Sequence, residues 1–221
     1  MTPASNDGPL ACQKALFSLD PEDCWLDSAY MGPLPDPVRR AGVAALERRA
    51  FPVDITPSDF FAPAERVRTM LGHMVGADPE RIAFVTTAAS GFALLERNLR
   101  PKAGANVVLL GDQFPSNVYP WRRWRAHGVE LRMVPPPDGP VRASGAGPGR
   151  AARWNAAVVA AVDERTMLVS IEQAHWTDGT LFDLARIEAR CREVGAVFAV
   201  DATQTAGAMP IDVDALSIDA L

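Results

Sequence analysis

The sequence predicts an α/β protein in which parallel strands alternate with helices. Of its 221 residues, 48% are hydrophobic and 22% are charged, which is the balance of a globular domain and not of a disordered or fibrous chain. From about residue 80 onward, short β-branched apolar runs alternate with stretches of helical periodicity. This alternation is typical of strands joined by crossover helices, and the length suits one large domain.

The predicted strands share a continuous apolar pattern, which is expected where a parallel sheet is covered on both faces. They are Ile82–Thr86, Asn106–Leu110, Val129–Val134, Met167–Ile171 and Val197–Asp201. The predicted helices between them run from Phe92 to Leu99, over Asn117–His127, from about Trp154, and over Leu184–Val194. Residues 135–151 contain Pro, Gly, Ala and Ser without periodicity, so we expect a flexible surface connection there.

The first 75 residues have a different pattern. A proline-rich stretch, MGPLPDP, precedes two predicted helices at Val38–Arg49 and Pro63–Val75. We therefore divide the chain into an amino-terminal arm with helices, residues 1–75, and an α/β domain, residues 76–221.

Composition excludes several classes of function. The net charge of −5, from 27 acidic and 22 basic residues, gives no electrostatic reason to expect nucleic acid or an anionic membrane as a partner. No apolar run approaches the roughly 18 residues of a membrane span, and the first ten residues lack the regions of a signal peptide. The three cysteines form no CxxC pair, and His73, His127 and His175 lie far apart, so no metal site is expected. These features predict a soluble, cytoplasmic protein.

Ligands of open α/β sheets bind beyond the carboxyl ends of the strands, and four predicted strand ends carry suggestive residues. After the first predicted strand, Ala88 and Ala89 are small enough for the amides at a helix amino terminus to approach a phosphate. The alternative is an ordinary helix start, capped by Thr87 or Ser90.

The loops after the next strands offer an aromatic and a polar wall. Phe114, held before a proline, can stack on a planar ring, or it can be a core aromatic under a loop. His175, Trp176 and Thr177 form a candidate site wall, or a turn that contains a packed tryptophan.

The last predicted strand ends in Asp201, directly after the buried run Val-Phe-Ala-Val. A carboxylate there is costly unless a cation or a hydrogen-bond donor meets it, and a protonated ring nitrogen would be such a partner. The alternative is an N-cap for a following helix.

Taken together, these strand ends describe a ligand with a phosphate, an aromatic ring and a ring nitrogen. At these residues the sequence resembles the class V aminotransferase group of fold type I pyridoxal-phosphate enzymes, which includes cysteine desulfurases, kynureninases and isopenicillin N epimerase-like proteins. The resemblance runs from Trp25, in WLDSAYMGP, to the end of the chain. Its most specific piece is DATQTAGAMPID, which starts at Asp201.

The resemblance implies the three-layer α/β/α large domain of this group, with bound pyridoxal 5'-phosphate. It implies that Asp201 pairs with the pyridinium nitrogen, that Gln204 lies near the 3' oxygen, and that Phe114 stacks on the ring. The phosphate loop falls on Ala88 and Ala89, where many relatives have a threonine, so backbone amides must do more of the binding. By resemblance, the stretch 27–32 borders the substrate pocket.

The implied substrate is an amino acid, the implied reaction is transamination, epimerisation or a lyase step such as desulfuration, and the implied assembly is a homodimer. The Phe114 loop mildly favours epimerase-like or kynureninase-like members. In this group a Schiff-base lysine follows the aspartate by about two dozen residues. Here the only lysines are Lys14 and Lys102, and the sequence stops at Leu221. The expectation is therefore a fragment without that lysine and without the small domain.

Two alternatives to such an enzyme fragment stay open at this point. One is a catalytically inactive truncated homologue that binds cofactor loosely or pairs with another subunit. The other is a nucleotide-binding domain, for which Gly145–Arg150 is the only motif; it lacks the last glycine of GxGxxG and does not lead from a strand directly into a helix, which disfavours it.

Overall fold

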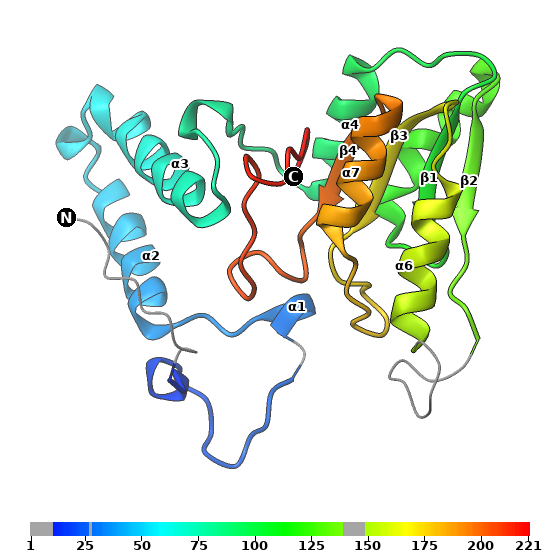
Figure 1. Ribbon diagram of the computed structural model, residues 1–221. Coiled ribbons are helices and arrows are strands. Elements are labelled where there is room, and N and C mark those ends of the chain that lie inside the picture. The colour runs from blue at the N-terminus through cyan, green and yellow to red at the C-terminus, as the bar shows by residue number, and fades with distance from the viewer. Residues whose placement is uncertain (1–10, 27, 139–148) are drawn as a thin grey trace. The chain divides into compact units, whose positions relative to one another are not determined.

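The computed structural model describes residues 11–26, 28–138 and 149–221. Contacts within the chain divide it into two compact units, Met1–Ala64 and Glu65–Leu221 (Figure 1). Most of helix α3 (Ala62–Val75) thus belongs with the second unit. The sequence-based division into 1–75 and 76–221 stays a prediction.

A parallel sheet forms the centre of the second unit. Its four strands have the order β2-β1-β3-β4, and each strand is parallel to its neighbours. The strands are β1 (Asn106–Leu110), β2 (Glu130–Val134), β3 (Thr166–Glu172) and β4 (Val197–Asp201). Because β1, β3 and β4 are adjacent, the loops that follow them meet at one edge of the sheet.

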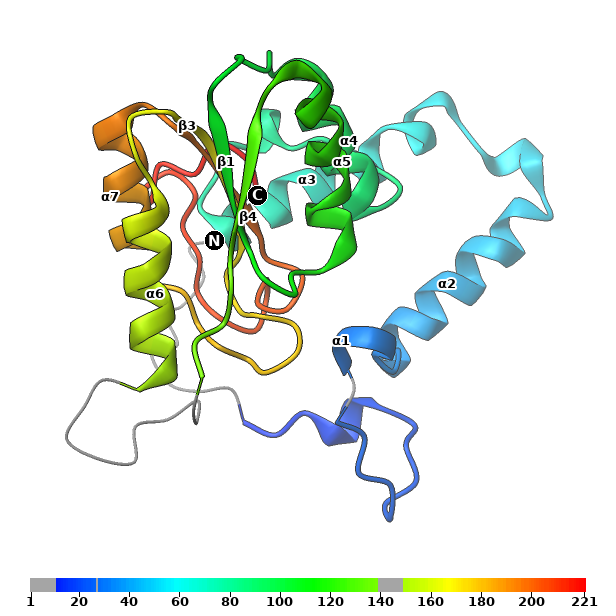
Figure 2. The ribbon, with the colours of Figure 1, turned by 90° about the vertical axis from the view of Figure 1, so that its right-hand side faces the viewer.

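Helices cover both faces of this sheet (Figure 2). On one face, α6 (Arg150–Ala161) and α7 (Leu184–Val194) pack through Trp154 and Ile187. On the other, α4 (Ala88–Asn98) and α5 (Tyr119–Arg122) pack with Trp121 and Trp124. The alternating side chains of β1 supply both cores, since Val108 and Leu110 face one layer of helices and Val107 and Leu109 the other. This is the predicted three-layer α/β/α arrangement.

Four of the five predicted strands are present, but the prediction of a strand at Ile82–Thr86 is wrong. A short 3-10 helix, η4 (Pro79–Arg81), precedes this segment, and residues 82–86 form no sheet ladder. A strand exists only where a neighbour accepts and donates its backbone hydrogen bonds, and no described strand lies beside this run. Instead, Arg68 Nε donates to the Ile82 carbonyl at 2.8 Å, and the Arg68 guanidinium lies 5.1 Å from the Phe84 ring centroid.

The predicted helix over residues 117–127 is divided in the structure. It consists of η5 (Pro115–Asn117), α5 and η6 (Arg123–His127), and ends at Gly128, which has a left-handed backbone with φ of 76°. The other predicted helices and strands agree with the structure to within about four residues at each end.

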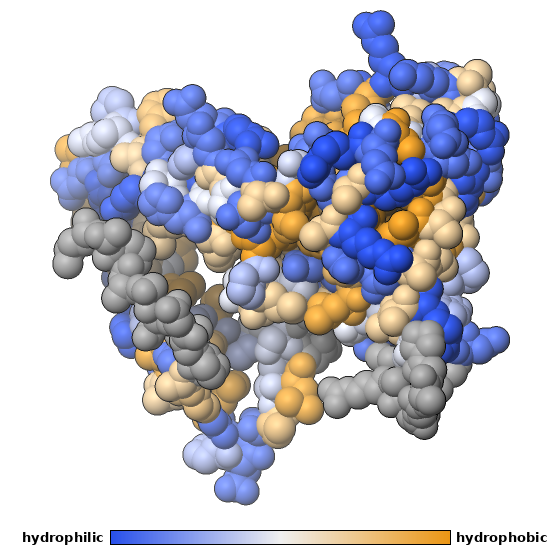
Figure 3. Space-filling view, in the orientation of Figure 1, coloured by the Kyte–Doolittle hydropathy of each residue, from blue (hydrophilic) through white to orange (hydrophobic). Residues whose placement is uncertain are grey.

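The chain after β4 is held to the same unit by backbone hydrogen bonds. Val200 N donates to the Ala220 carbonyl at 2.8 Å, so residues near 220 run parallel to β4. Val213 N donates to the Val75 carbonyl at 2.8 Å, which attaches this segment to α3. In the space-filling view, hydrophilic residues cover the outward side of α7, with hydrophobic residues beside them (Figure 3).

The described part of the first unit has helices but no buried core. It contains η1 (Lys14–Leu16), α1 (Ser28–Met31), α2 (Asp36–Arg49), η2 (Pro52–Asp54) and η3 (Pro57–Phe60). No residue described between 11 and 64 is buried. A two-pronged ion pair between Arg48 and Asp59, at 2.8 Å, joins α2 to η3.

Three features expected from the sequence lie wholly or partly outside the described residues. These are most of the connection 135–151, the glycines at 145 and 147, and Asp27. Among the helices that the structure does describe, none is long and apolar enough to cross a membrane.

Candidate functional site

Asp201 ends β4 as a buried carboxylate with one oxygen left open. The residue is 8% exposed, and its Oδ1 accepts hydrogen bonds from Thr203 N at 3.0 Å and Thr203 Oγ1 at 2.6 Å. Within the described chain, Oδ2 accepts none. Residues 202–209 form turns and not a helix, so Asp201 is not an N-cap. The open oxygen can therefore accept a hydrogen bond from a ligand that carries a donor.

Buried polar side chains fix the turn that follows Asp201. Gln173 N donates to the Asp201 carbonyl at 3.0 Å, and Thr205 Oγ1 donates to Gln173 Oε1 at 2.5 Å. Gln204 lies between these anchors, is half-buried, and makes no side-chain hydrogen bond to any described residue. Its amide is thus available at the same edge as Asp201.

Phe114 lies on the loop after β1 and is 46% exposed, so it is not a core aromatic. Its ring meets the ring of Trp176 edge to face, with centroids 5.3 Å apart and an interplanar angle of 90°. Trp176 is also 46% exposed, and its Nε1 donates to the Asp112 carbonyl at 2.7 Å. The two aromatic side chains from the loops after β1 and β3 thus form one surface.

Two buried amides hold the Phe114 loop, and the sequence analysis missed both. Gln113 Oε1 accepts a hydrogen bond from Leu110 N at 3.0 Å, while its Nε2 donates to the Ser170 carbonyl at 3.1 Å. Asn117 Oδ1 accepts a hydrogen bond from the Ser170 hydroxyl. The only signal in the sequence is that amides flank the Phe-Pro pair, and such residues are common in exposed loops as well.

Glu172 is the most consequential residue that the sequence analysis missed. It ends β3, is 3% exposed, and pairs in register with Asp201 on β4. Its Oε1 accepts a hydrogen bond from Phe114 N at 2.8 Å, and its Oε2 accepts one from Trp176 N at 2.9 Å. Burial raises the pKa of Glu172 to about 7, against the effect of these two hydrogen bonds, and the charges of Asp201 and Asp178 also raise it. The signal was a carboxylate at the end of a buried apolar run, as at Asp201.

His175 is turned into the interior. It is 2% exposed, and the centroid of its ring lies 4.9 Å from that of Trp154 on α6. Its Nδ1 is hydrogen bonded to Thr177 Oγ1 at 2.9 Å, and its Nε2 to the Gly111 carbonyl at 3.2 Å. The sequence predicted a site wall of three residues. In the structure Trp176 contacts Phe114, while Thr177 is hydrogen bonded to the buried His175.

Ala88 and Ala89 form the exposed first turn of α4. Thr87 caps this helix, because its Oγ1 accepts a hydrogen bond from Ser90 N at 3.1 Å, as the N-cap alternative predicts. The amides of the first turn have no acceptor within the helix, so capping by Thr87 leaves Ala88 and Ala89 with free donors for an anion.

The direction of α4 points these amides toward the carboxyl edge of the sheet. Glu96, near the end of α4, accepts a hydrogen bond from Trp124 Nε1 at 3.1 Å, and Trp124 lies shortly before β2 begins. The end of α4 is therefore near the amino edge of the sheet, and its beginning lies toward the opposite edge, where α4 packs beside η5.

Comparison with known proteins identifies the family. Residues 56–221 match the family model described as Aminotransferase class-V. The chain belongs to the class V aminotransferase family. It is 30% identical over 202 residues to a probable cysteine desulfurase of Methanothermobacter thermautotrophicus, covering 88% of this chain and 47% of that protein. It is 28% identical over 204 residues to an isopenicillin N epimerase of Streptomyces clavuligerus, covering 91% and 49%.

Solved structures of such enzymes have the same fold. A C-DES mutant with glycine covalently linked to its PLP cofactor has a TM-score of 0.77 at 19% identity, over 95% of this chain and 54% of that one. The cysteine desulfurase CsdA from Escherichia coli has a TM-score of 0.70 at 21% identity, over 93% and 51%. These structures confirm the predicted fold class, and the family model confirms the predicted family. The chain spans about half the length of the relatives it matches.

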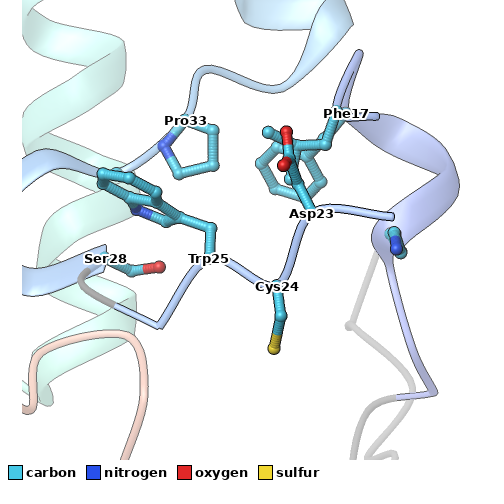
Figure 4. A pocket seen from close by; sticks show the side chains of 9 residues that line it. Phe17, Asp23, Cys24, Trp25, Ser28 and Pro33 are labelled. Atoms are coloured by element: carbon cyan, nitrogen blue, oxygen red, sulfur yellow. The ribbon is translucent and has the colours of Figure 1, made fainter. Parts of the chain in front are cut away.

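A separate hollow lies within the first unit (Figure 4). Phe17, Asp23, Trp25 and Pro33 line it together with Lys14, Leu19, Cys24, Ser28 and Gly32. Trp25 Nε1 donates to the Met31 carbonyl at 2.9 Å, which closes the backbone around it. None of the predicted cofactor residues belongs to this hollow.

Proposed function

We propose that this chain binds pyridoxal 5'-phosphate at the carboxyl edge of its sheet, as part of a class V aminotransferase-family enzyme that acts on an amino acid. The single observation that carries the proposal is Asp201, a buried carboxylate with an open oxygen, at the same edge of the sheet as the exposed ring of Phe114. Burial of such a group is costly without a donor or cation opposite it, and a protonated pyridine nitrogen supplies both.

The residues around Asp201 suit the other parts of the same ligand. Phe114 presents a ring that is held in place through its own backbone amide, and Gln204 has an uncommitted side-chain amide in the turn after Asp201. The first turn of α4, with Ala88 and Ala89, offers backbone donors and the positive end of a helix dipole to the phosphate. When bound, the cofactor supplies an electron sink for reactions at an amino acid.

The family supports several related reactions, and transamination, epimerisation and lyase or desulfuration chemistry all remain within the proposal. The relatives bear on this choice because they are named as a cysteine desulfurase and as an isopenicillin N epimerase. A homodimer, which the family resemblance implies, and a cytoplasmic location, which the composition of the sequence predicts, complete the proposal.

Lys102 is not placed to react with a ring held at Asp201. It precedes β1, at the amino edge of the sheet, whereas Asp201 lies at the carboxyl edge. A strand of five residues separates these edges by roughly 16 Å. Lys102 is therefore excluded from the site by the direction of the parallel strands.

The test is the binding of pyridoxal 5'-phosphate to the 221-residue chain. Binding is measured by the quenching of tryptophan fluorescence, in a buffer without primary amines. We expect saturable binding that Asp201→Asn weakens at least tenfold, because a hydrogen bond to a charged group contributes about 1.5–3 kcal/mol. Asp183→Asn is the matched control, since Asp183 caps α7 through Oδ1 and asparagine also caps helices. Equal affinity of the wild type and a folded Asp201→Asn variant would contradict the proposal.

A further inference from the structure

The carboxyl edge of the sheet carries a second buried carboxylate, which no ligand contact explains. Glu172 and Asp201 are register partners on adjacent parallel strands, so their side chains project from the same face of the sheet. Glu172 faces backbone donors from two separate loops, and Asp201 is left with an open oxygen. The inference that follows rests on the proposed function, because it concerns a ring bound at Asp201.

We propose that Glu172 is a positioning residue that joins the loop after β1, which carries Phe114, to the loop after β3, which carries Trp176. We propose further that Glu172 responds to the charge of a ring held at Asp201. Its two oxygens accept from Phe114 N and Trp176 N, at 2.8 and 2.9 Å. His175 and Trp176 also connect the loops, through the carbonyls of Gly111 and Asp112. Among the described side chains, however, only Glu172 accepts from the backbone amides of both Phe114 and Trp176. Glu172 therefore bridges the two loops and holds the backbone of the two residues whose rings meet edge to face.

The protonation state of Glu172 decides the strength of the bridge. An ionised carboxylate accepts at both oxygens, whereas a protonated one carries a hydrogen on one of them and accepts well only at the other. Charge-assisted hydrogen bonds are also about twice as strong as neutral ones. The bridge is therefore strongest when Glu172 is charged.

The surroundings of Glu172 keep its protonated and ionised forms at comparable populations near neutral pH. Burial raises the pKa of Glu172 to about 7, with Asp201 and Asp178 acting in the same direction. The other charged or titratable groups nearby are His175, which lies on the loop after β3, Arg150 on α6, which pairs with Asp178, and Asp112 on the Phe114 loop.

A positively charged ring at Asp201 shifts this balance. The ring offsets the charge of Asp201, which is one of the groups that disfavour ionisation of Glu172, and an opposite charge in the vicinity lowers a carboxyl pKa. Binding thus favours ionised Glu172 and tightens both aromatic loops around the ring. Glu172 itself does not contact the ring and acts through the backbone of Phe114 and Trp176.

The experiment follows the backbone amide resonances of Phe114 and Trp176 by NMR as the pH is raised from 5 to 9, without and with pyridoxal 5'-phosphate. Without ligand, we expect both amides to titrate together with a midpoint near 7. With ligand, we expect the midpoint to fall by about one pH unit. Glu172→Gln removes the titration of both amides, and Glu188→Gln, the same change at a buried glutamate on α7, leaves it intact.

The outcomes separate this inference from the proposed function. Amides that do not titrate, or that titrate equally in Glu172→Gln, overturn the bridge. Bound ligand with an unchanged midpoint overturns the response to ring charge while the proposed function stands. Failure of the ligand to bind refutes the proposed function and the charge response, and the ligand-free titration still decides the bridge. If Glu172→Gln does not fold, carbon-13 labelling of glutamate carboxyls in the wild type must show one group with a midpoint near 7, or the bridge is rejected.

Discussion

Two carboxylates at neighbouring strand ends have different environments, and the difference lies in their hydrogen bonds. Among the described residues, the Asp201 carboxylate accepts only from Thr203 in its own turn and keeps one oxygen open. Glu172 has both oxygens engaged by backbone amides of other loops. The first arrangement suits ligand binding and the second suits loop positioning.

The burial of Glu172 makes the stability of the protein depend on pH. Its pKa rises from an ordinary 4.5 to about 7 on folding, so the folded state binds this proton more tightly than the unfolded chain. The stabilisation is complete below about pH 4.5 and is lost as the pH rises through 7. At about 1.4 kcal/mol per pKa unit, the loss is about 3 kcal/mol.

We therefore expect the free energy of unfolding of the wild type, relative to Glu172→Gln, to fall by about 2.5 kcal/mol between pH 5 and pH 8, because part of the total loss already occurs below pH 5. Urea denaturation at the two pH values measures this difference. Glu188→Gln should show no comparable change relative to the wild type. A difference between wild type and Glu172→Gln that is the same at both pH values would show that Glu172 titrates normally.

The three cysteines should differ sharply in reactivity. Burial raises the pKa of the Cys191 thiol to about 12, with further contributions from Glu188 and Asp219, whereas Cys12 and Cys24 are exposed. Because the thiolate is the reactive form, we expect a disulfide reagent at pH 8 to modify Cys12 and Cys24 rapidly and Cys191 only after unfolding. Peptide mapping locates the modified residues, and rapid modification of Cys191 in the folded protein would contradict its burial.

At the scale of elements, the start of α4 has a structural and a proposed binding role. Thr87 accepts from Ser90 N, and the alanines that follow leave first-turn amides exposed. We expect Thr87→Ala to lower the free energy of unfolding by about 1 kcal/mol, because it removes the cap. We also expect it to weaken pyridoxal 5'-phosphate binding, because a frayed first turn no longer aligns its amides.

Chemical denaturation and a ligand titration of Thr87→Ala test both parts. Thr69→Ala, at an exposed threonine inside α3, is the control and should leave both quantities nearly unchanged. If Thr87→Ala loses stability but binds the ligand normally, the phosphate does not sit on this turn.

The local sequence pattern was sufficient to predict most helices and strands. It failed for one strand, whose formation depends on pairing with a neighbouring strand. The run Val197–Asp201 is predicted with the bounds of β4, because an apolar β-branched stretch buried on both faces has few other conformations. The run Ile82–Thr86 is similarly apolar and β-branched but has no neighbouring strand in the described chain. Strand formation depends on a partner, and a local pattern contains no information about one.

At the scale of the whole molecule, the two compact units differ in how much they bury. The strands β1 and β3 lie in the core of the second unit, whereas no described residue between 11 and 64 is buried. Helices gain most of their stability from tertiary packing, so the helical conformation of α2 receives little stabilisation from the described residues.

The rates of amide hydrogen exchange should therefore differ between the two units. We expect the amides of α2 to exchange within seconds to minutes near neutral pH, and those of β1 and β3 to resist exchange far longer, because they open only when the core opens. Mass spectrometry of peptic peptides measures both. Protection of α2 equal to that of β3 would mean that α2 is covered by another surface in solution.

Periodicity in the sequence was enough to predict the alternation of strands and helices, and position at predicted strand ends singled out Asp201, Phe114, Ala88 and Ala89. The family was predicted from the resemblance of local motifs. All of these signals act over a few neighbouring residues. Tertiary packing, which the sequence pattern does not contain, turns His175 inward against Trp154. It also lets Gln113 and Asn117 anchor the loop after β1, and it makes Glu172, the register partner of Asp201, a bridge between two loops. Burial, hydrogen-bond partners and pKa values depend on groups that can be far apart in the sequence, because folding brings them together. Glu172 and Phe114, for example, are 58 residues apart, and the adjacency of β1, β3 and β4 sets which groups meet.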